Sequence, residues 1–343
     1  MRDGTQDRHW LPGEEAFCLP LGRWDELDST GEGGACSLLS KMPEPLLVAA
    51  VGDIHGRFHR VETWLDALEQ ARGRQVDLVL AVGDVEAFRR ADDHRRKAAK
   101  RAMPAEFAEY ADGLRQVKRP LYFIGGNNED FEALHDLQQG GTLAPNVTYL
   151  GRAGLRELRG LRVAYLSGIH APRFVDQPLR PPSTPDMVKQ AGYFRTPEVE
   201  QLSMLRDVDL LLVHEWPRGI VQRARDENPS PPRPLPSYWI GNPVTRRLVD
   251  AVMPKWMLCG HSHKGFAVTL EGPDRPPTRI ACLDQAARPQ ESIFWLEYEG
   301  RQAQRAGWGV SGAVAWTAGQ RWDMASLPAL LTEGEGTPAE AGL

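Results

Sequence analysis

Residues 46–56 read LLVAAVGDIHG, an unbroken apolar run that ends in a short polar segment with an aspartate and a histidine. Apolar runs of this kind are typical of strands that are buried on both faces of a sheet. The glycines on either side of the polar residues permit a tight turn. The sequence therefore predicts a buried strand over 46–51, followed by a loop that presents Asp53 and His55.

The same arrangement, an apolar run followed by a polar signature, recurs farther along the chain. The further signatures are GDVEA at 83–87, GGNNED at 125–130, VHEWP at 213–217 and GHSH at 260–263. In open α/β sheets, ligands bind beyond the carboxyl ends of the strands. Because every signature follows a predicted strand, we expect all of them to meet at one edge of the fold.

Together the signatures supply enough oxygen and nitrogen ligands for two divalent metal ions. The candidate metal ligands are Asp53, His55, Asp84, Asn127, His214, His261 and His263. None is a thiolate, so Mn, Fe, Zn or Mg suits the set better than a soft metal, and we favour Mn. Two such ions about 3.5–4 Å apart clamp a phosphate for in-line displacement. We therefore predict hydrolysis of a phosphoester, with Asp84 as the carboxylate that bridges the ions.

The composition is that of an ordinary globular protein. The 343 residues are 41% hydrophobic and 25% charged, which allows one large α/β domain with extensions. A net charge of −5 gives no overall attraction to nucleic acid, so any such contact would be local. The sequence shows neither the run of about eighteen apolar residues that a membrane helix needs nor a secretory signal at its start. With four cysteines in no disulfide-like spacing, we expect a cytoplasmic protein without membrane contact.

Strands and helices alternate in the first half of the domain. Strand 46–51 is followed by apolar residues at helical spacing from Val61 to Leu68, then by strands at 76–82 and 120–124. This order predicts an α/β fold with a parallel sheet and right-handed crossovers. The second half is richer in strands, which we predict at 146–150, 161–167, 209–213, 256–259, 266–270, 279–283 and 294–298.

Composition also divides the chain into three parts. Residues 1–44 are rich in Gly, Pro and acidic side chains, and we expect them to form an N-terminal extension. Residues 45–300 carry all the signatures and form the expected catalytic domain. The strand pattern weakens after Gly300, so 301–343 are expected to be a C-terminal tail.

Several residues beside the signatures are candidates for contacts with substrate or ligands. The basic stretch 89–101, which begins at Arg89, is either a solvated helix face or a contact for phosphates of a long substrate. Tyr193 either stacks on a base or packs within the fold. Glu86 and Glu129 either orient metal ligands or are exposed carboxylates.

The signatures and the segments between them resemble the calcineurin-like metallophosphoesterases, and among these the RNA lariat debranching enzymes. The matching segments are GDVEAFR at 83–89, FIGGNNE at 123–129, GGTLAPNVTYLGRAG at 140–154, LRGLRVAYLSGI at 158–169, HEWPRGI at 214–220, PKWMLCGHSHKGFAV at 254–268 and IACLDQAARP at 280–289. The resemblance covers roughly residues 46–300. It implies a β-sandwich of two mixed sheets flanked by helices, and hydrolysis of a 2′–5′ phosphodiester at an RNA branch point with Mn, Fe or Zn.

The resemblance also implies how the ligands are divided between two metals. One metal would be held by Asp53, His55, Asp84 and His263. The other would be held by Asp84, Asn127, His214 and His261. Debranching enzymes often carry Cys in place of Asp53, whereas Asp matches the wider superfamily and favours a conventional site with two metals.

A second departure from the family pattern concerns the proton donor. The family signature has His where this chain has Asn128, and an asparagine has no titratable proton to donate. His170, His59 or water could supply the proton instead. The candidate catalytic residues are therefore Asp84, Asn128 and His170.

Two other functions remain open from the sequence. One is a generic phosphoesterase for nucleotides or small diesters, which Asn128 and the acidic net charge favour. The other is an interaction scaffold that binds metal but has lost catalysis. The complete set of candidate ligands argues against the scaffold.

Overall fold

The computed structural model describes residues 45–90, 106–181, 184–227 and 240–320. The expected N-terminal extension, 1–44, lies outside these residues, as does 91–101 of the basic stretch. Within the described part of the chain, no helix is both long and apolar enough to cross a membrane.

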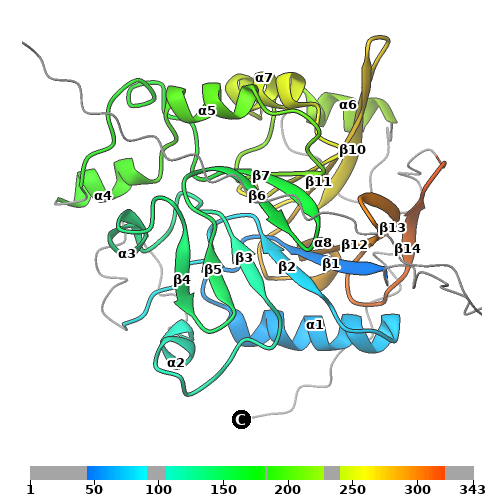
Figure 1. Cartoon of the computed structure of the whole chain (residues 1–343), viewed down its shortest axis with the longest axis horizontal. Coiled ribbons are helices and arrows are strands. Elements are labelled where there is room, and N and C mark those ends of the chain that lie inside the picture. The colour runs from blue at the N-terminus through cyan, green and yellow to red at the C-terminus, as the bar shows by residue number, and fades with distance from the viewer. Residues whose placement is uncertain (1–44, 91–105, 182–183, 228–239, 321–343) are drawn as a thin grey trace, which may run out of the picture. The chain divides into compact units, whose positions relative to one another are not determined.

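The strands form two sheets (Figure 1). The first sheet has the order β14 (Val314–Thr317), β13 (Gln302–Trp308), β12 (Ile293–Glu299), β1 (Leu46–Val51), β2 (Leu78–Ala81), β3 (Leu121–Phe123), β5 (Val147–Tyr149) and β4 (Gly141–Ala144). The second has the order β10 (Phe266–Gly272), β11 (Arg275–Cys282), β9 (Trp256–Cys259), β8 (Leu210–Val213), β7 (Leu161–Leu166) and β6 (Ala153–Leu158).

Both sheets are mixed, with parallel strands at their centres and antiparallel pairs toward their edges. In the first sheet β1, β2, β3 and β5 run parallel, while β12 pairs antiparallel with β1. In the second, β7, β8, β9 and β11 run parallel, and β6 and β10 close the edges as antiparallel strands. The α/β fold with two mixed sheets, expected from the resemblance, is confirmed.

Helices cover the outer face of each sheet (Figure 1). The helices are α1 (Phe58–Arg72), α2 (Phe107–Ala111), α3 (Phe131–His135), α4 (Pro185–Ala191), α5 (Thr196–Ser203), α6 (Ile220–Glu227), α7 (Pro243–Val252) and α8 (Pro289–Ser292). Apolar residues of α1 and α2 pack on the first sheet, and those of α5, α6 and α7 pack on the second.

Successive side chains of β1 point to opposite faces, which explains why its apolar run is unbroken. Val48 and Ala50 pack in the layer between the sheets, together with residues of β7, β8 and β9. Leu47 and Ala49 pack on the other face against α1. The strand is thus buried on both sides, as the sequence predicts.

Two strands follow the point where the sequence pattern weakens. β13 pairs antiparallel with β12, and β14 pairs antiparallel with β13. Trp308 and Trp316 from these strands are buried in the layer between the sheets. The predicted boundary at residue 300 therefore falls inside the first sheet, between β12 and β13.

Candidate metal centre

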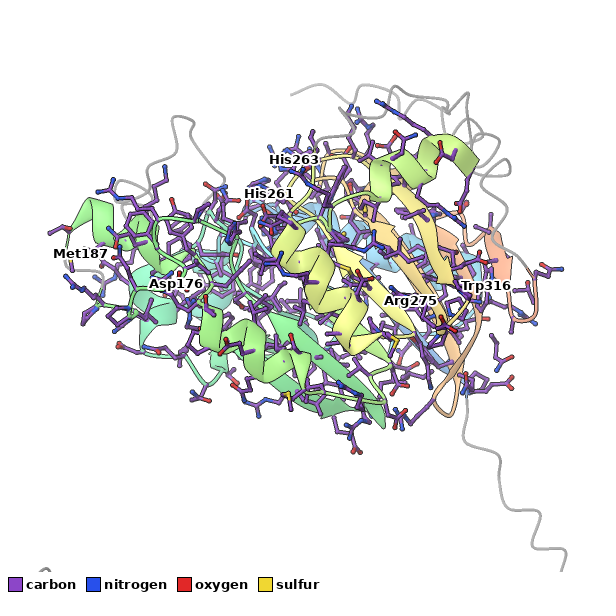
Figure 2. The ribbon with its side chains drawn as sticks, turned by 90° about the horizontal axis from the view of Figure 1, so that it is seen from above. Asp176, Met187, His261, His263, Arg275 and Trp316 are labelled. Atoms are coloured by element: carbon purple, nitrogen blue, oxygen red, sulfur yellow. The ribbon has the colours of Figure 1, made fainter. Side chains whose placement is uncertain are left out.

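The five signatures follow strands from both sheets. Asp53 and His55 follow β1, Asp84 follows β2, Asn127 and Asn128 follow β3, His214 follows β8, and His261 and His263 follow β9. The first three strands belong to one sheet and the last two to the other. In Figure 2, His261 and His263 lie close together, at a distance from Arg275 and Trp316 on the strands β11 and β14. The carboxyl ends of strands from both sheets thus contribute to one site.

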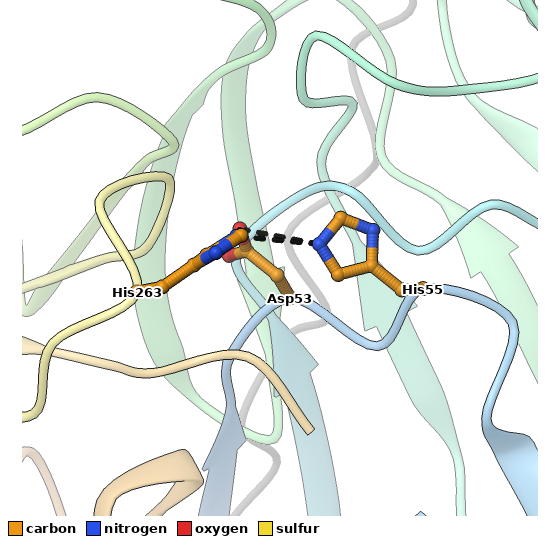
Figure 3. Close-up of side chains that lie close together, drawn as sticks. All are labelled: Asp53, His55 and His263. Atoms are coloured by element: carbon orange, nitrogen blue, oxygen red, sulfur yellow. Dashed lines mark hydrogen bonds and ion pairs between the residues drawn. The ribbon is translucent and has the colours of Figure 1, made fainter. Parts of the chain in front are cut away.

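The first group of possible ligands comprises Asp53, His55 and His263 (Figure 3). One ligand atom from each lies within 4.8 Å of the others. The His263 Nε2 atom is 2.9 Å from Asp53 Oδ2 and 3.3 Å from the Nε2 atom of His55. Two imidazole nitrogens that face each other beside a carboxylate form a donor set that suits a divalent cation.

The second group comprises Asp53, Asp84 and His214, all of them buried. The Nε2 atom of His214 is 3.5 Å from Asp84 Oδ1 and 3.3 Å from Asn127 Oδ1. The carboxylate common to both groups is Asp53, whereas Asp84 belongs to the second group alone. Asp84 was the bridging residue expected from the sequence.

Hydrogen bonds to the Nδ1 atoms of His214 and His55 fix which ring nitrogen faces the other candidate ligands. The Nδ1 atom of His214 is 2.7 Å from the carbonyl oxygen of Val82, and that of His55 is 2.6 Å from Glu86 Oε1. Each oxygen is an acceptor, so Nδ1 carries the proton and Nε2 keeps its lone pair. Such partners commonly orient histidines that bind metals. Glu86 is therefore a buried acceptor rather than an exposed carboxylate.

His261 contacts the cluster through its backbone as well as its ring. Its N–H lies 3.1 Å and 3.2 Å from the two carboxylate oxygens of Asp53. Its ring centroid lies 5.0 Å from that of His214. Burial, together with His214, lowers the pKa of His261 to about 4. The ring is therefore neutral near pH 7, which is the form that binds metals.

The two buried carboxylates make the cluster electrostatically costly without a cation. Burial, with a contribution from Asp53, raises the pKa of Asp84. Burial also acts to raise the pKa of Asp53, but the surrounding imidazoles, above all His214, outweigh it and lower that pKa. Divalent cations would compensate the buried negative charge and use the free Nε2 lone pairs. The residues present therefore fit a metal centre.

The loops that carry these side chains adopt backbone conformations that are costly for residues other than glycine. The φ angle is positive at His55 (49°), Asp84 (47°), His261 (69°) and His263 (49°). Such strain persists only where surrounding structure enforces it, and it often marks functional sites. The strained backbone therefore holds these four side chains in the positions of the site.

Two glycines bring the backbone close to the carboxylates. A Cβ atom at Gly126 would overlap with the Asp84 carboxylate and lie 2.8 Å from His214 Nε2. A Cβ atom at Gly260 would overlap with the Asp53 carboxylate. No side chain fits at either position, so the close approach of the loops requires glycine.

Asn128, the predicted catalytic residue at the position of the family histidine, contacts Asp84. Its backbone N–H donates to Asp84 Oδ1 and its side-chain amide to Asp84 Oδ2, each at 2.7 Å. These two bonds fix the orientation of the carboxylate.

The other predicted catalytic residue, His170, is half-buried just after β7. Its ring centroid lies 5.7 Å from that of Phe194. Its backbone N–H donates to Glu215 Oε2 at 2.8 Å. The Nε2 atom of the alternative proton donor, His59, lies 3.2 Å from Glu109 Oε2. Neither histidine belongs to the two groups of possible metal ligands.

The two predicted substrate contacts lie outside the cluster. Tyr193 is half-buried and stacks on Phe174, with ring centroids 5.5 Å apart and an interplanar angle of 12°. Arg89 is exposed in the segment that follows Glu86.

One structural residue of the site was missed from the sequence. The Oε2 atom of Glu215 also accepts a hydrogen bond at 3.0 Å from Asn242 Nδ2, at the start of α7. Glu215 thereby joins the loops after β7 and β8 to α7. The only signal in the sequence was its position next to His214.

Comparisons with known proteins show the family to which the chain belongs. A family model for the calcineurin-like phosphoesterases matches residues 46–265. The chain is 28% identical over 267 residues to lariat debranching enzyme A of Xenopus laevis, a match that covers 74% of this chain and 50% of that protein.

Two further lariat debranching enzymes are similar to the same extent. That of Caenorhabditis briggsae is 30% identical over 273 residues, covering 73% of this chain and 53% of its own. That of Homo sapiens is 28% identical over 272 residues, covering 74% and 49%. The chain spans about half the length of these relatives. Since the family model matches well over half of the chain, including every signature through His263, this protein belongs to the calcineurin-like phosphoesterase family.

Proposed function

We propose that this protein is a phosphodiesterase that uses two divalent metal ions to hydrolyse a bond in nucleic acid or a nucleotide. The observation that carries the proposal is the pair of adjoining ligand groups that share the buried Asp53 carboxylate. Two of their imidazoles, those of His55 and His214, are already oriented by acceptors bound to Nδ1. A site of this composition suits metal-assisted hydrolysis of a phosphoester.

The residues divide into two ligand sets. We assign Asp53, His55, Asp84 and His263 to one ion, and Asp84, Asn127, His214 and His261 to the other. Mn is the preferred metal, with Fe and Zn as alternatives, because the donors are oxygen and imidazole nitrogen. When bound, two such cations would neutralise charge on the phosphate and lower the pKa of a water molecule toward neutrality.

The protein's own residues orient the ligands and supply the proton. Asn128 holds both oxygens of Asp84 through its amide and backbone. Because Asn128 cannot donate a titratable proton, we assign protonation of the leaving oxygen to His170, with His59 or water as alternatives.

The relatives support an RNA substrate. They are lariat debranching enzymes, and a branched 2′–5′ phosphodiester is therefore the first substrate that we propose. Tyr193 and Arg89 are proposed to contact a base and a phosphate, respectively. A small nucleotide diester is the alternative, which the replacement of the family histidine by Asn128 and the acidic net charge favour.

A substrate panel tests the proposal. Branched 2′–5′ RNA, linear RNA, DNA and cyclic dinucleotides should be incubated with metal-free protein and with added Mn, Fe or Zn. We expect metal-dependent cleavage of the branched RNA, and loss of that cleavage in Asp84→Asn. Preferential cleavage of cyclic dinucleotides would select the alternative. Absence of turnover on every substrate at full metal loading would leave the catalytically inactive scaffold as the explanation.

A further inference from the structure

A buried carboxylate outside the ligand set lies between two of the metal-site loops. Glu129 is 4% exposed. Its Oε1 atom accepts hydrogen bonds from the backbone N–H groups of Val85, at 3.0 Å, and Gly126, at 3.1 Å. Its Oε2 atom accepts from the N–H of Glu86 at 2.8 Å. One side chain therefore binds three backbone donors.

These donors belong to the loops after β2 and β3. Val85 follows the candidate ligand Asp84, and Gly126 precedes the candidate ligand Asn127. Because both donors share one oxygen atom of Glu129, this acceptor joins the two loops, in addition to the two hydrogen bonds that Asn128 donates to Asp84.

The third donor extends this connection to the loop after β1. The Glu86 residue whose N–H binds Glu129 also binds His55 Nδ1 through Oε1, at 2.6 Å. The φ angle of Glu86 is 55°, a conformation that needs support from its surroundings. The bond from Glu129 supplies that support, so the carboxylate influences the orientation of His55 through Glu86.

Only a carboxylate can satisfy this arrangement. It has two acceptor atoms and no hydrogen to donate, whereas a glutamine has one acceptor and an NH₂ group. A glutamine whose oxygen faced Val85 and Gly126 would direct its NH₂ group at the N–H of Glu86. Two hydrogen-bond donors, the NH₂ group and the N–H of Glu86, would then face each other in a buried position with no acceptor between them.

We propose that Glu129 is a positioning residue that holds the loops after β1, β2 and β3 in the arrangement that binds metal. The inference rests on the proposed function, since it assumes that Asp84, Asn127 and His55 bind metal. Glu129 itself belongs to neither group of possible metal ligands.

The test compares Glu129→Gln with Asp130→Asn. The control removes a neighbouring carboxylate but retains the side-chain oxygen that caps α3 by accepting from the N–H of Ala133. We expect Mn affinity, measured by isothermal titration calorimetry, to fall by about 10- to 100-fold in Glu129→Gln, the usual effect of losing an outer partner of a ligand. The control should bind Mn like the wild type.

Hydrogen exchange of the metal-free protein gives a second readout. The amides of Val85 and Glu86 should exchange faster in Glu129→Gln, while those of β8 keep their protection. If Glu129→Gln folds poorly, Glu129→Asp keeps the charge but shortens the side chain, and it should show the same loss of Mn affinity.

The outcomes separate this inference from the proposed function. Wild-type Mn affinity and unchanged exchange in Glu129→Gln would overturn the positioning role while leaving the metal site intact. A wild-type protein that binds none of Mn, Fe and Zn would refute the proposed function, and unchanged exchange at Val85 and Glu86 in Glu129→Gln would then refute the connection between the loops as well. Faster exchange with unchanged Mn affinity would show a purely structural role and would also overturn the proposal.

Discussion

Replacing Asp53 by Asn should remove the stabilisation that metal binding gives to the protein. Asp53 is fully buried and is the one carboxylate in both groups of possible ligands. Asparagine has the same shape, and its side-chain oxygen can still accept from the N–H of His261. The metal-free variant should therefore fold, with a melting temperature within a few degrees of the wild type. It lacks the negative charge that attracts both cations.

The size of the effect follows from binding linkage. Metal at a free concentration of about 100 times Kd stabilises a folded protein by about 2.7 kcal/mol for each site. For a domain of this size, about 1 kcal/mol shifts Tm by about 2–4 °C. Saturating Mn should therefore raise the wild-type Tm by about 5–10 °C for each ion bound. In Asp53→Asn we expect most of this shift to disappear.

Differential scanning calorimetry over a series of Mn concentrations measures the shift directly. Asp112→Asn, at an exposed position just after α2, is a matched control and should respond to Mn like the wild type. If Asp53→Asn kept the full shift with the same dependence on Mn concentration, Asp53 would not be a metal ligand and the assignment of the set Asp53, His55, Asp84 and His263 would be wrong.

Three further predictions concern neighbouring residues. Asn128→His restores the family residue and should raise turnover of diesters with poor leaving groups at least about tenfold relative to p-nitrophenyl diesters, as general acid catalysis does; an unchanged ratio of rates would contradict this. Gly126→Ala places a Cβ atom against Asp84 and His214, so we expect a loss of about 1–3 kcal/mol in denaturant unfolding and weaker Mn binding; wild-type values for both would show that the loop has room. Burial, then Arg247, lowers the pKa of His170, so if His170 is the proton donor, kcat should fall as pH rises through a pKa below the usual histidine value, and His170→Ala should lack that step. An unchanged pH profile would remove His170 from the mechanism.

The sequence predicted the centre of the fold because its strands are continuous apolar runs. Strands such as β1 and β8 are buried along nearly their whole length, so burial is visible in composition alone. Of the four edge strands, β10 was predicted at 266–270, whereas β4, β6 and β14 were not. β6 has only one buried residue, and β14 is only four residues long, so neither has a clear apolar pattern.

The candidate ligands could be recognised because each follows a buried strand within a short signature. Glu86 and Glu129 could be named only as possible partners, and the partner of His214 could not be recognised, because these contacts join residues far apart in the chain. The acceptor of His214 Nδ1 is a backbone carbonyl 132 residues away, at Val82. Every residue has a backbone carbonyl, so the sequence cannot show which carbonyl orients the imidazole. Only the structure identifies it. The three backbone donors around Glu129 are hidden from the sequence for the same reason.

Anomalous diffraction from crystals soaked in Mn would show whether two metal ions bind among the candidate ligands. We expect two anomalous peaks about 3.5–4 Å apart. Ligands to these peaks should come from Asp53, His55 and His263 on one side and from Asp84 and His214 on the other. A map with no Mn peak among these side chains, or with peaks only elsewhere on the protein, would contradict this expectation.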